Sequence, residues 1–392
     1  MDYAKHLNPA FTAVPPSGIR KFFDIVSEMP DAISLGVGEP DFVTPWAIRE
    51  SAIQSLEDGV TQYTSNWGRI RLRKLIATYM QQRFGVGYDP DGEVLVTVGA
   101  SEGIDLSLRA MILPGDEVLV PEPSYVSYAP NVVFAGGTPV PVATTFEEEF
   151  RLTAPALRAA ITPRTKALIL SYPNNPTGAM MRRQDLEAIA DVLRDTDILV
   201  ISDEIYAELT YGGYTHTCFA ALPGMRERTI VLNGFSKAFA MTGWRMGYAC
   251  GPREILALMC KIHQYTIMCA PTQGQIAAEQ ALAQGLEDDF AEVRRMVTSY
   301  DQRRRLMVRG FQEMGLPCFE PLGAFYVFPS IRGTGLSSQA FCEQLLRAEQ
   351  VACVPGDAFG ASGEGHIRCC YATALEKLEE ALTRIRRFVT RG

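Results

Sequence analysis

The sequence predicts an α/β protein built on a mainly parallel sheet, with helices on its faces and a second, smaller domain. Between about residues 93 and 251, short apolar runs that end in polar residues alternate with segments of helical periodicity. This alternation is typical of parallel strands joined by crossover helices. Farther along, long helical segments are followed by short strands and more helices, which predicts an α+β domain. Ligands bind at the carboxyl ends of parallel strands, so we expect the functional site there.

The predicted elements follow in chain order. The N-terminal part holds an expected amphipathic helix over 19–29 and an apolar strand over 33–42. The larger domain is expected to contain a helix over 71–80, a strand–turn–helix unit over 93–110, strands over 117–120, 167–171, 198–202 and 229–232, and helices over 184–194 and 253–267. A long helix over 288–314 leads to the smaller domain, with expected strands over 323–329, 351–355 and 366–372 and helices over 339–349 and 375–389.

The composition is that of an ordinary globular protein and disfavours several other classes. Of the 392 residues, 47% are hydrophobic and 21% are charged, and the net charge is −8, so no basic footprint for nucleic acid is expected. No apolar run is long enough to span a membrane, and residues 1–10 lack the apolar core of a signal peptide. Nine scattered cysteines and four histidines argue against a disulfide framework and against a metal site. We therefore expect a cytoplasmic protein.

The strongest chemical signal lies in residues 229–251, TIVLNGFSKAFAMTGWRMGYACG. A buried strand that stops at an Asn-Gly pair would bring Ser236, Lys237 and Arg245 to one place. Burial lowers the pKa of a lysine and frees its amine to form a Schiff base with a carbonyl compound. A hydroxyl beside an arginine suits a phosphate dianion. This stretch therefore predicts a site for a phosphate and an aldehyde.

Residues 236–248 resemble the lysine segment of the class I/II aminotransferases of fold type I, which depend on pyridoxal 5′-phosphate. Further segments match the family in order along nearly the whole chain. The resemblance implies that Lys237 forms the internal aldimine with the cofactor and that Ser236 and Arg245 bind its phosphate. It also implies an aspartate aminotransferase-like fold whose large domain contains a seven-stranded sheet.

A second phosphate contact is expected where the strand of the 93–110 unit turns into its helix. Free N–H groups at the start of a helix bind anions, so Gly99, Ala100, Ser101 and Glu102 are positioned to hold phosphate through their amides. The resemblance places the cofactor phosphate here. Ser101 could equally serve as a helix cap, a role compatible with the first.

The segment QYTSNWG at 62–68 resembles the family pattern Y-x-x-x-x-G. By this resemblance Tyr63 would reach across a dimer interface to the phosphate in the other subunit, and a buried structural tyrosine is the alternative. Trp67 stands where many relatives have a small residue, which would alter the substrate pocket.

Four residues are expected around the cofactor ring. By the resemblance, Tyr125 stacks on the pyridine face, while Asn175 and Tyr206 bond the 3-oxygen. A carboxylate at the end of a buried strand is costly unless it is paired, and Asp203 occupies such a position. A protonated pyridine nitrogen would be its partner, which keeps the ring able to accept electrons.

The substrate is expected to contact Gly38, Asn175, Trp67 and Arg368. Arg368 lies within an apolar strand and needs an anion, for which the α-carboxylate of an amino acid is suited, with a structural ion pair as the alternative. The G-x-G at 36–38 opens no helix, which disfavours a dinucleotide site. By the resemblance, Gly38 instead borders the substrate.

The resemblance implies an enzyme that transfers the amino group of an L-amino acid to a 2-oxo acid such as 2-oxoglutarate by a ping-pong mechanism. Aspartate, aromatic amino acids and N-acetyl-diaminopimelate are the candidate substrates; another cofactor-dependent enzyme such as a carbon–sulfur lyase, or a non-catalytic regulator, is the alternative. A homodimer with shared sites is expected. The expected parts are an N-terminal arm (1–45), a large cofactor-binding domain (46–285) and a small C-terminal domain (286–392).

Overall fold

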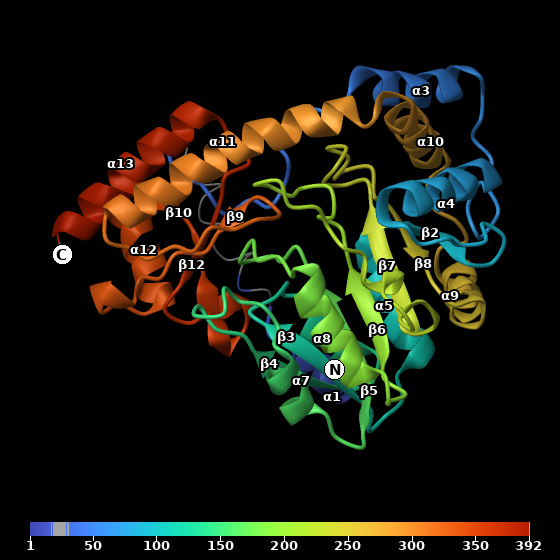
Figure 1. Cartoon of the computed structure of the whole chain (residues 1–392), viewed down its shortest axis with the longest axis horizontal. Coiled ribbons are helices and arrows are strands. Elements are labelled where there is room, and N and C mark those ends of the chain that lie inside the picture. Colours follow the sequence, from blue (N-terminus) through green and yellow to red (C-terminus); the bar gives the residue numbers. More distant parts are fainter. Residues whose placement is uncertain (17, 19–28, 30, 392) are drawn as a thin grey trace.

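The computed structural model describes residues 1–16, 18, 29 and 31–391. The helix predicted over 19–29 lies, apart from Met29, outside the described residues. One large sheet covered by helices occupies one end of the molecule (Figure 1). Short strands gather at the other end beside α11 (Ala291–Glu313), α12 (Ser338–Glu349) and α13 (Leu375–Arg391).

The large sheet has seven strands in the order β2-β8-β7-β6-β5-β3-β4. Its strands are β2 (Val94–Val98), β3 (Glu117–Glu122), β4 (Thr138–Ala143), β5 (Thr165–Ser171), β6 (Leu199–Asp203), β7 (Thr229–Gly234) and β8 (Met246–Cys250). Strand β8 runs antiparallel to both of its neighbours, while the other pairs are parallel. The predicted mainly parallel seven-stranded sheet is thereby confirmed.

Apolar residues on both faces of the sheet are covered by helices. Along β5, Ala167 and Ile169 belong to one buried cluster, and Leu168 and Leu170 belong to another, as the two-residue period of a strand requires. The first cluster includes residues from α5 (Gly99–Met111), α6 (Tyr128–Phe134) and α9 (Arg253–Thr266). The opposite face is covered by α4 (Ile70–Phe84), α7 (Ala154–Ala160), α8 (Arg183–Leu193) and α10 (Thr272–Asp288), with α3 (Trp46–Glu57) packed on α10.

The C-terminal part of the chain packs around its own buried cluster. Strands β9 (Tyr326–Val327), β11 (Val354–Pro355) and β12 (Ile367–Cys370) form a three-stranded antiparallel sheet, and β1 (Ile33–Ser34) pairs in parallel with β10 (Val351–Ala352). Further short helical elements are Tyr3–Lys5, Pro9–Thr12, Phe219–Ala221, Arg226–Arg228, Arg332–Thr334, Gly356–Phe359 and Ala361–Gly363. The division into an arm and two domains at the expected boundaries stays a prediction.

Four predicted elements differ from the structure. The strand expected over 323–329 is reduced to the two residues of β9, and the strand expected over 351–355 is divided into β10 and β11, which belong to different sheets. The helix expected over 288–314 is interrupted, because Asp289 and Phe290 adopt left-handed backbone conformations between α10 and α11. The strand expected over 33–42 is only two residues long. The carbonyl groups that follow it accept hydrogen bonds from residues outside the β1–β10 pair.

Six elements of the large sheet and its cover were not predicted, namely β4, β8, α3, α6, α7 and α10. The sequence explains why for three of them. Edge strand β4 contains two prolines, which weaken the strand pattern in the sequence and are common at a sheet edge, where fewer amide donors are needed. Helix α10 has glycines inside it, and a β-carbon at Gly274 or Gly285 would lie 2.7 Å from Met246 Sδ or 2.4 Å from a carbon of the Phe290 ring. Close packing therefore requires glycine at these positions, and the glycines weaken the helical pattern of this segment in the sequence. The third, β8, lies within the lysine segment.

Candidate active site

A cavity of about 840 Å³ opens at the carboxyl edge of the large sheet. Parallel strands bring their ends together at this edge, and Ser171 at the end of β5 is in register with Asp203 at the end of β6. Eleven of the predicted site residues line the cavity: Gly38, Ala100, Ser101, Tyr125, Asn175, Asp203, Tyr206, Ser236, Lys237, Arg245 and Arg368. Tyr63, Trp67, Gly99 and Glu102 are not among the lining residues.

Lys237 follows the end of β7 and points its amine into the cavity. Its Nζ donates a hydrogen bond to the Gly38 carbonyl oxygen at 2.6 Å and lies 5.7 Å from the centre of the Tyr206 ring. Burial, assisted by the positive charges of Arg368 and Arg245 and opposed by Cys370 and Glu39, lowers the pKa of Lys237 to about 8. A substantial fraction of neutral amine is therefore available as a nucleophile near neutral pH.

An anion cradle lies at the N-terminus of α5. The helix starts at Gly99, and Ala100 and Ser101 in its first turn line the cavity together with Ser236 and Arg245. A β-carbon on Gly99, whose φ is +72°, would lie 2.6 Å from Arg245 Nη2, so only glycine lets the arginine approach the helix. The cradle combines amide groups, a hydroxyl and a guanidinium, which together suit a phosphate dianion.

The Glu102 carboxylate turns away from this cradle. Its Oε2 accepts a hydrogen bond from the Val98 amide at 2.6 Å, and its Oε1 lies 2.7 Å from Nδ1 of the fully buried His263. Both oxygens of the Glu102 carboxylate therefore have hydrogen-bond partners within the protein, behind the first turn of α5.

Asp203 is buried, with 5% of its surface exposed, and is held by two groups. The Tyr128 hydroxyl lies 2.8 Å from both Asp203 Oδ2 and Ser171 Oγ, and the Ile205 amide donates to Asp203 Oδ1 at 3.2 Å. An ionised carboxylate can only accept, so Tyr128 donates to Asp203 and accepts from Ser171. Burial raises the pKa of Asp203, and these hydrogen bonds oppose the rise.

Sequence reasoning missed Tyr128, although a signal was present. Tyr128 stands three residues after Tyr125, and their rings meet edge-on with centroids 5.6 Å apart. A second aromatic residue one helical turn from a predicted ring-stacking residue would have been a reason to consider it.

Tyr326 was also missed, and it joins three predicted site residues. Its hydroxyl lies 2.9 Å from the Tyr206 hydroxyl, and its ring lies 4.6 Å from the Arg368 guanidinium. A β-carbon on Gly38 would lie 2.5 Å from the Tyr326 hydroxyl, which explains the glycine there. Within the apolar run 323–329, no local signal distinguished this tyrosine from a core residue.

Arg368 on β12 lies buried in the cavity wall. Its Nη1 donates to Asn175 Oδ1 at 2.9 Å, and its Nη2 donates to the Gly36 carbonyl oxygen at 2.5 Å. Its Nε is buried and has no hydrogen-bond partner among the described residues. A buried, unsatisfied cationic donor at a cavity is a strong attractant for an anionic group.

Tyr63 and Trp67 lie outside the cavity. The Tyr63 side chain is 80% exposed, so the alternative of a buried structural tyrosine is wrong. Trp67 packs against the apolar cluster beside α5, and its carbonyl oxygen accepts a hydrogen bond from the Val96 amide. Within a single chain, neither residue is brought to the cavity.

The residues of the cavity fit pyridoxal 5′-phosphate, since a buried amine, an anion cradle and a buried carboxylate all face one space. The family model for aminotransferase class I and II matches residues 30–385. The chain belongs to the class I and II aminotransferases. Enzymes of this family use pyridoxal 5′-phosphate and transfer amino groups by a ping-pong mechanism. The predictions of an aminotransferase and of its cofactor are confirmed.

Several relatives support this assignment. The chain is 48% identical to an aspartate aminotransferase of Pyrococcus abyssi over 95% of each chain, and 45% identical to aromatic-amino-acid aminotransferase 2 of Thermococcus litoralis over 97% of each chain. The solved structure of aspartate aminotransferase from Thermus thermophilus with maleate has a TM-score of 0.93 and 39% identity, covering 97% of this chain and 99% of that one. The aspartate aminotransferase-like fold is therefore confirmed.

Neither a metal cluster nor a membrane-spanning helix occurs among the described residues. In residues 1–16, 18, 29 and 31–391, no cluster of three or more His, Cys, Asp or Glu side chains is arranged to hold a metal ion. Over the same residues, no helix combines the length and apolar character needed to cross a membrane. All nine cysteines are free thiols.

Removing the Tyr128 hydroxyl should weaken the enzyme most at low pH. In Tyr128→Phe, Asp203 loses a donor that lowers its pKa, so the acid limb of the kcat/KM profile should move to higher pH. One lost hydrogen bond to a carboxylate, about 1.5 kcal/mol, corresponds to about a tenfold loss of kcat/KM near neutrality. A pH–rate profile measures both effects.

Tyr79→Phe is the matched control, because the Tyr79 hydroxyl is also buried on a carboxylate, that of Glu208 at 2.7 Å, but lies away from the cavity. Its profile should equal that of the wild type. An unshifted acid limb in Tyr128→Phe would contradict the positioning of Asp203 by Tyr128.

Proposed function

We propose that this aminotransferase moves the amino group of an L-amino acid to 2-oxoglutarate, with aspartate, an aromatic amino acid or N-acetyl-diaminopimelate as the donor. The observation that carries the proposal is that Arg368 lines the same cavity as Lys237 and that its buried Nε has no hydrogen-bond partner among the described residues. A planar guanidinium holds a carboxylate in a fixed orientation. An α-carboxylate bound there would present its α-amino group to the centre of the cavity.

The cavity residues take separate roles toward the cofactor. When bound, pyridoxal 5′-phosphate supplies an electron sink for the α carbon of the substrate. Ser236, Arg245 and the amides of the first turn of α5, from Gly99 to Glu102, hold the phosphate. Asp203 holds a proton on the pyridine nitrogen and Tyr125 covers the ring.

Lys237 has two roles in the proposal. Its Nζ would hold the cofactor covalently, and the same amine, when free, would serve as the base that moves the proton of the substrate α carbon. A base with a pKa of about 8 is matched to this task near neutral pH. Tyr206 and Asn175 bond the 3-oxygen, and Gly38 borders the substrate.

The lining of the cavity favours an aromatic donor among the three candidates. The lining includes the apolar side chains of Val14, Pro15, Pro16, Val126, Pro130 and Phe134. The described cations of the lining, Lys237, Arg245 and Arg368, are all assigned to the cofactor or the α-carboxylate. An apolar side chain is therefore accommodated with less desolvation cost than a second carboxylate.

We further propose a cytoplasmic homodimer with shared sites. The exposed Tyr63 is free to reach the phosphate bound in a second copy, and Trp67 on the same loop would meet a substrate only from that side. Nine free cysteines support a reducing compartment. The proposed arm and domains keep the boundaries given above.

A donor panel tests the proposed activity. With 2-oxoglutarate as acceptor, phenylalanine or tyrosine should yield glutamate with a kcat/KM about tenfold or more above that of aspartate, because an apolar wall discriminates by about 1–3 kcal/mol. Glutamate formation and release of ammonia are measured together. The panel includes an S-substituted cysteine, whose conversion to ammonia and pyruvate without glutamate formation from any donor would contradict transamination. A preference for aspartate would contradict the aromatic donor.

Loss of the Lys237 amine should abolish turnover. Lys237→Ala is expected to lower kcat by about a thousandfold or more, since the variant loses both the covalent anchor and the proton carrier. Borohydride reduction of the wild-type holoenzyme should label the peptide that contains residue 237. Lys377→Ala, at an exposed position on α13, is the matched control and should keep full activity. An active Lys237→Ala enzyme would overturn the proposed mechanism.

Loss of the Arg368 guanidinium should weaken every α-carboxylate substrate. Arg368→Ala should raise KM for the amino acid and for the 2-oxo acid by about thirtyfold, because a charge-assisted contact of about 2 kcal/mol disappears. Steady-state kinetics measures both constants, and cofactor absorbance verifies that the site stays loaded. Unchanged KM values would reassign Arg368 to a structural role.

A further inference from the structure

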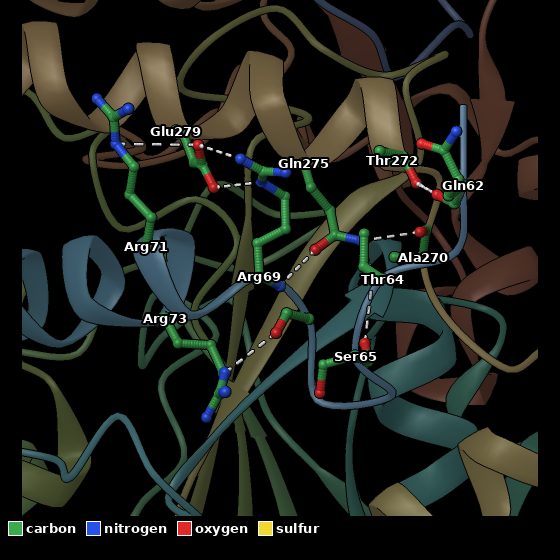
Figure 2. A network of polar contacts seen from close by, with 11 residues as sticks. Gln62, Thr64, Ser65, Arg69, Arg71, Arg73, Ala270, Thr272, Gln275 and Glu279 are labelled. Atoms are coloured by element: carbon green, nitrogen blue, oxygen red, sulfur yellow. Dashed lines mark hydrogen bonds and ion pairs between the residues drawn. The ribbon is translucent and has the colours of Figure 1, made fainter. Parts of the chain in front are cut away.

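The loop over 60–69 presents Tyr63 to the outside while its flanking residues are tightly bound to α10. On one side, Thr272 Oγ1 donates to the Gln62 carbonyl oxygen at 2.8 Å; on the other, Gln275 Nε2 donates to Thr64 Oγ1 at 2.9 Å. Figure 2 shows these contacts between the loop and the helix. An exposed ring thus sits between two anchored neighbours.

Gln275 is the centre of this network. Its side chain is fully buried, and its amide makes three hydrogen bonds, two as donor and one as acceptor (Figure 2). Besides Thr64, Nε2 donates to the Ala270 carbonyl oxygen at 2.8 Å, while Oε1 accepts from the Arg69 amide at 2.8 Å. One side chain therefore holds the loop on the C-terminal side of Tyr63 and the segment before α10.

A charged pair and a close contact reinforce the arrangement. Arg69 Nε donates to Glu279 Oε1 at 2.6 Å, one helical turn beyond Gln275 (Figure 2). At Gly68, a β-carbon would lie 2.4 Å from Val96 and 3.3 Å from Gln275 Oε1, so the loop backbone lies directly on the helix and the sheet.

The surface beside Tyr63 is suited to a second protein chain. Asn66 Nδ2 donates to the Met268 carbonyl oxygen at 2.8 Å, which places the segment 265–268 next to the loop. In that segment Tyr265, Ile267 and Met268 expose 84%, 40% and 44% of their surface. Ordering a loop on binding costs conformational entropy, so a loop that is already fixed binds with less loss.

We propose that Gln275 is a positioning residue that fixes Tyr63 for a second copy of this chain, so that the Tyr63 hydroxyl meets the cofactor phosphate in that copy. The inference rests on the proposed role of Tyr63. Gln275 itself does not line the cavity, and it acts through the loop. Gly274 beside it packs against Met246 and the Trp244 carbonyl, so the same helix also supports the strand that follows Arg245.

The test uses Gln275→Met, which keeps the length and burial of the side chain but removes its hydrogen bonds. Binding of pyridoxal 5′-phosphate to the apoenzyme should weaken about tenfold, as for loss of one contact to a charged group, while the protein remains dimeric. Binding of pyridoxal, which has no phosphate, should stay unchanged. Equal weakening for both ligands would reduce Gln275 to a structural role and overturn the proposal.

A double-mutant cycle separates this inference from the role of Tyr63. Tyr63→Phe alone should also weaken the phosphate form about tenfold, and the double variant should lose little more, because the two residues act on one contact. No effect in Tyr63→Phe would refute the proposed role of Tyr63, and with it the inference. An effect in Tyr63→Phe but none in Gln275→Met would overturn the inference alone.

Two further variants keep the outcome interpretable. Thr64→Val removes the acceptor beside Tyr63 without altering α10, and should weaken the phosphate form severalfold even if Gln275→Met folds poorly. Gln284→Met is the matched control on the same helix, where the side-chain amide donates to Asp288 within α10, and it should bind both ligands as the wild type does. Wild-type binding of the phosphate form by Thr64→Val would contradict the proposal.

Discussion

Burial of the Lys237 amine is the constraint on which the rest of the site depends. In water a lysine amine is protonated at neutral pH, and its removal from water at the end of β7 brings its pKa to about 8. The same burial acts in the opposite direction on Asp203, whose pKa rises. At this sheet edge burial therefore favours the uncharged form of both the Lys237 amine and the Asp203 carboxyl. Hydrogen bonds from the Tyr128 hydroxyl and the Ile205 amide oppose the rise in the pKa of Asp203, and a pyridinium nitrogen would oppose it further.

The backbone over 35–38 contacts both the C-terminal part of the chain and the lysine at the large sheet, so the two parts form one site. The Leu35 carbonyl accepts from the Cys370 amide, the Gly36 carbonyl from Arg368, and the Gly38 carbonyl from Lys237. These groups would otherwise have extended β1 as a strand. Because every buried carbonyl needs a partner, a segment that serves a neighbouring strand, a guanidinium and an amine cannot remain regular. The irregular segment thus connects β12 of the C-terminal part to the lysine at the large sheet.

Much of the fold could be predicted because buried parallel strands are continuous apolar runs with polar ends, and the polar ends contain Asp203 and Lys237. The residues that position them could not. The Tyr128 hydroxyl meets a carboxylate 75 positions away, and the Tyr326 hydroxyl meets Tyr206 across 120 positions. Local sequence cannot distinguish such a tyrosine from a core residue, since its apolar ring is buried in either case. Helix α10 was not predicted for a related reason, because its glycines are required by close contacts with residues outside the helix.

Some polar groups of the site have hydrogen-bond partners within the protein, and others do not. The Asp203 carboxylate and the amide of Gln275 already have protein partners, and these groups fix geometry. The Nε of Arg368 has none among the described residues, and the first-turn amides of α5 open onto the cavity. Groups that are already hydrogen-bonded within the protein need not be ordered when a ligand binds. A buried donor without a partner, in contrast, contributes a large favourable free energy when a ligand provides its first hydrogen bond. Binding energy is therefore concentrated at the positions of a phosphate and a carboxylate, while the orientation of both is fixed by contacts the chain makes with itself.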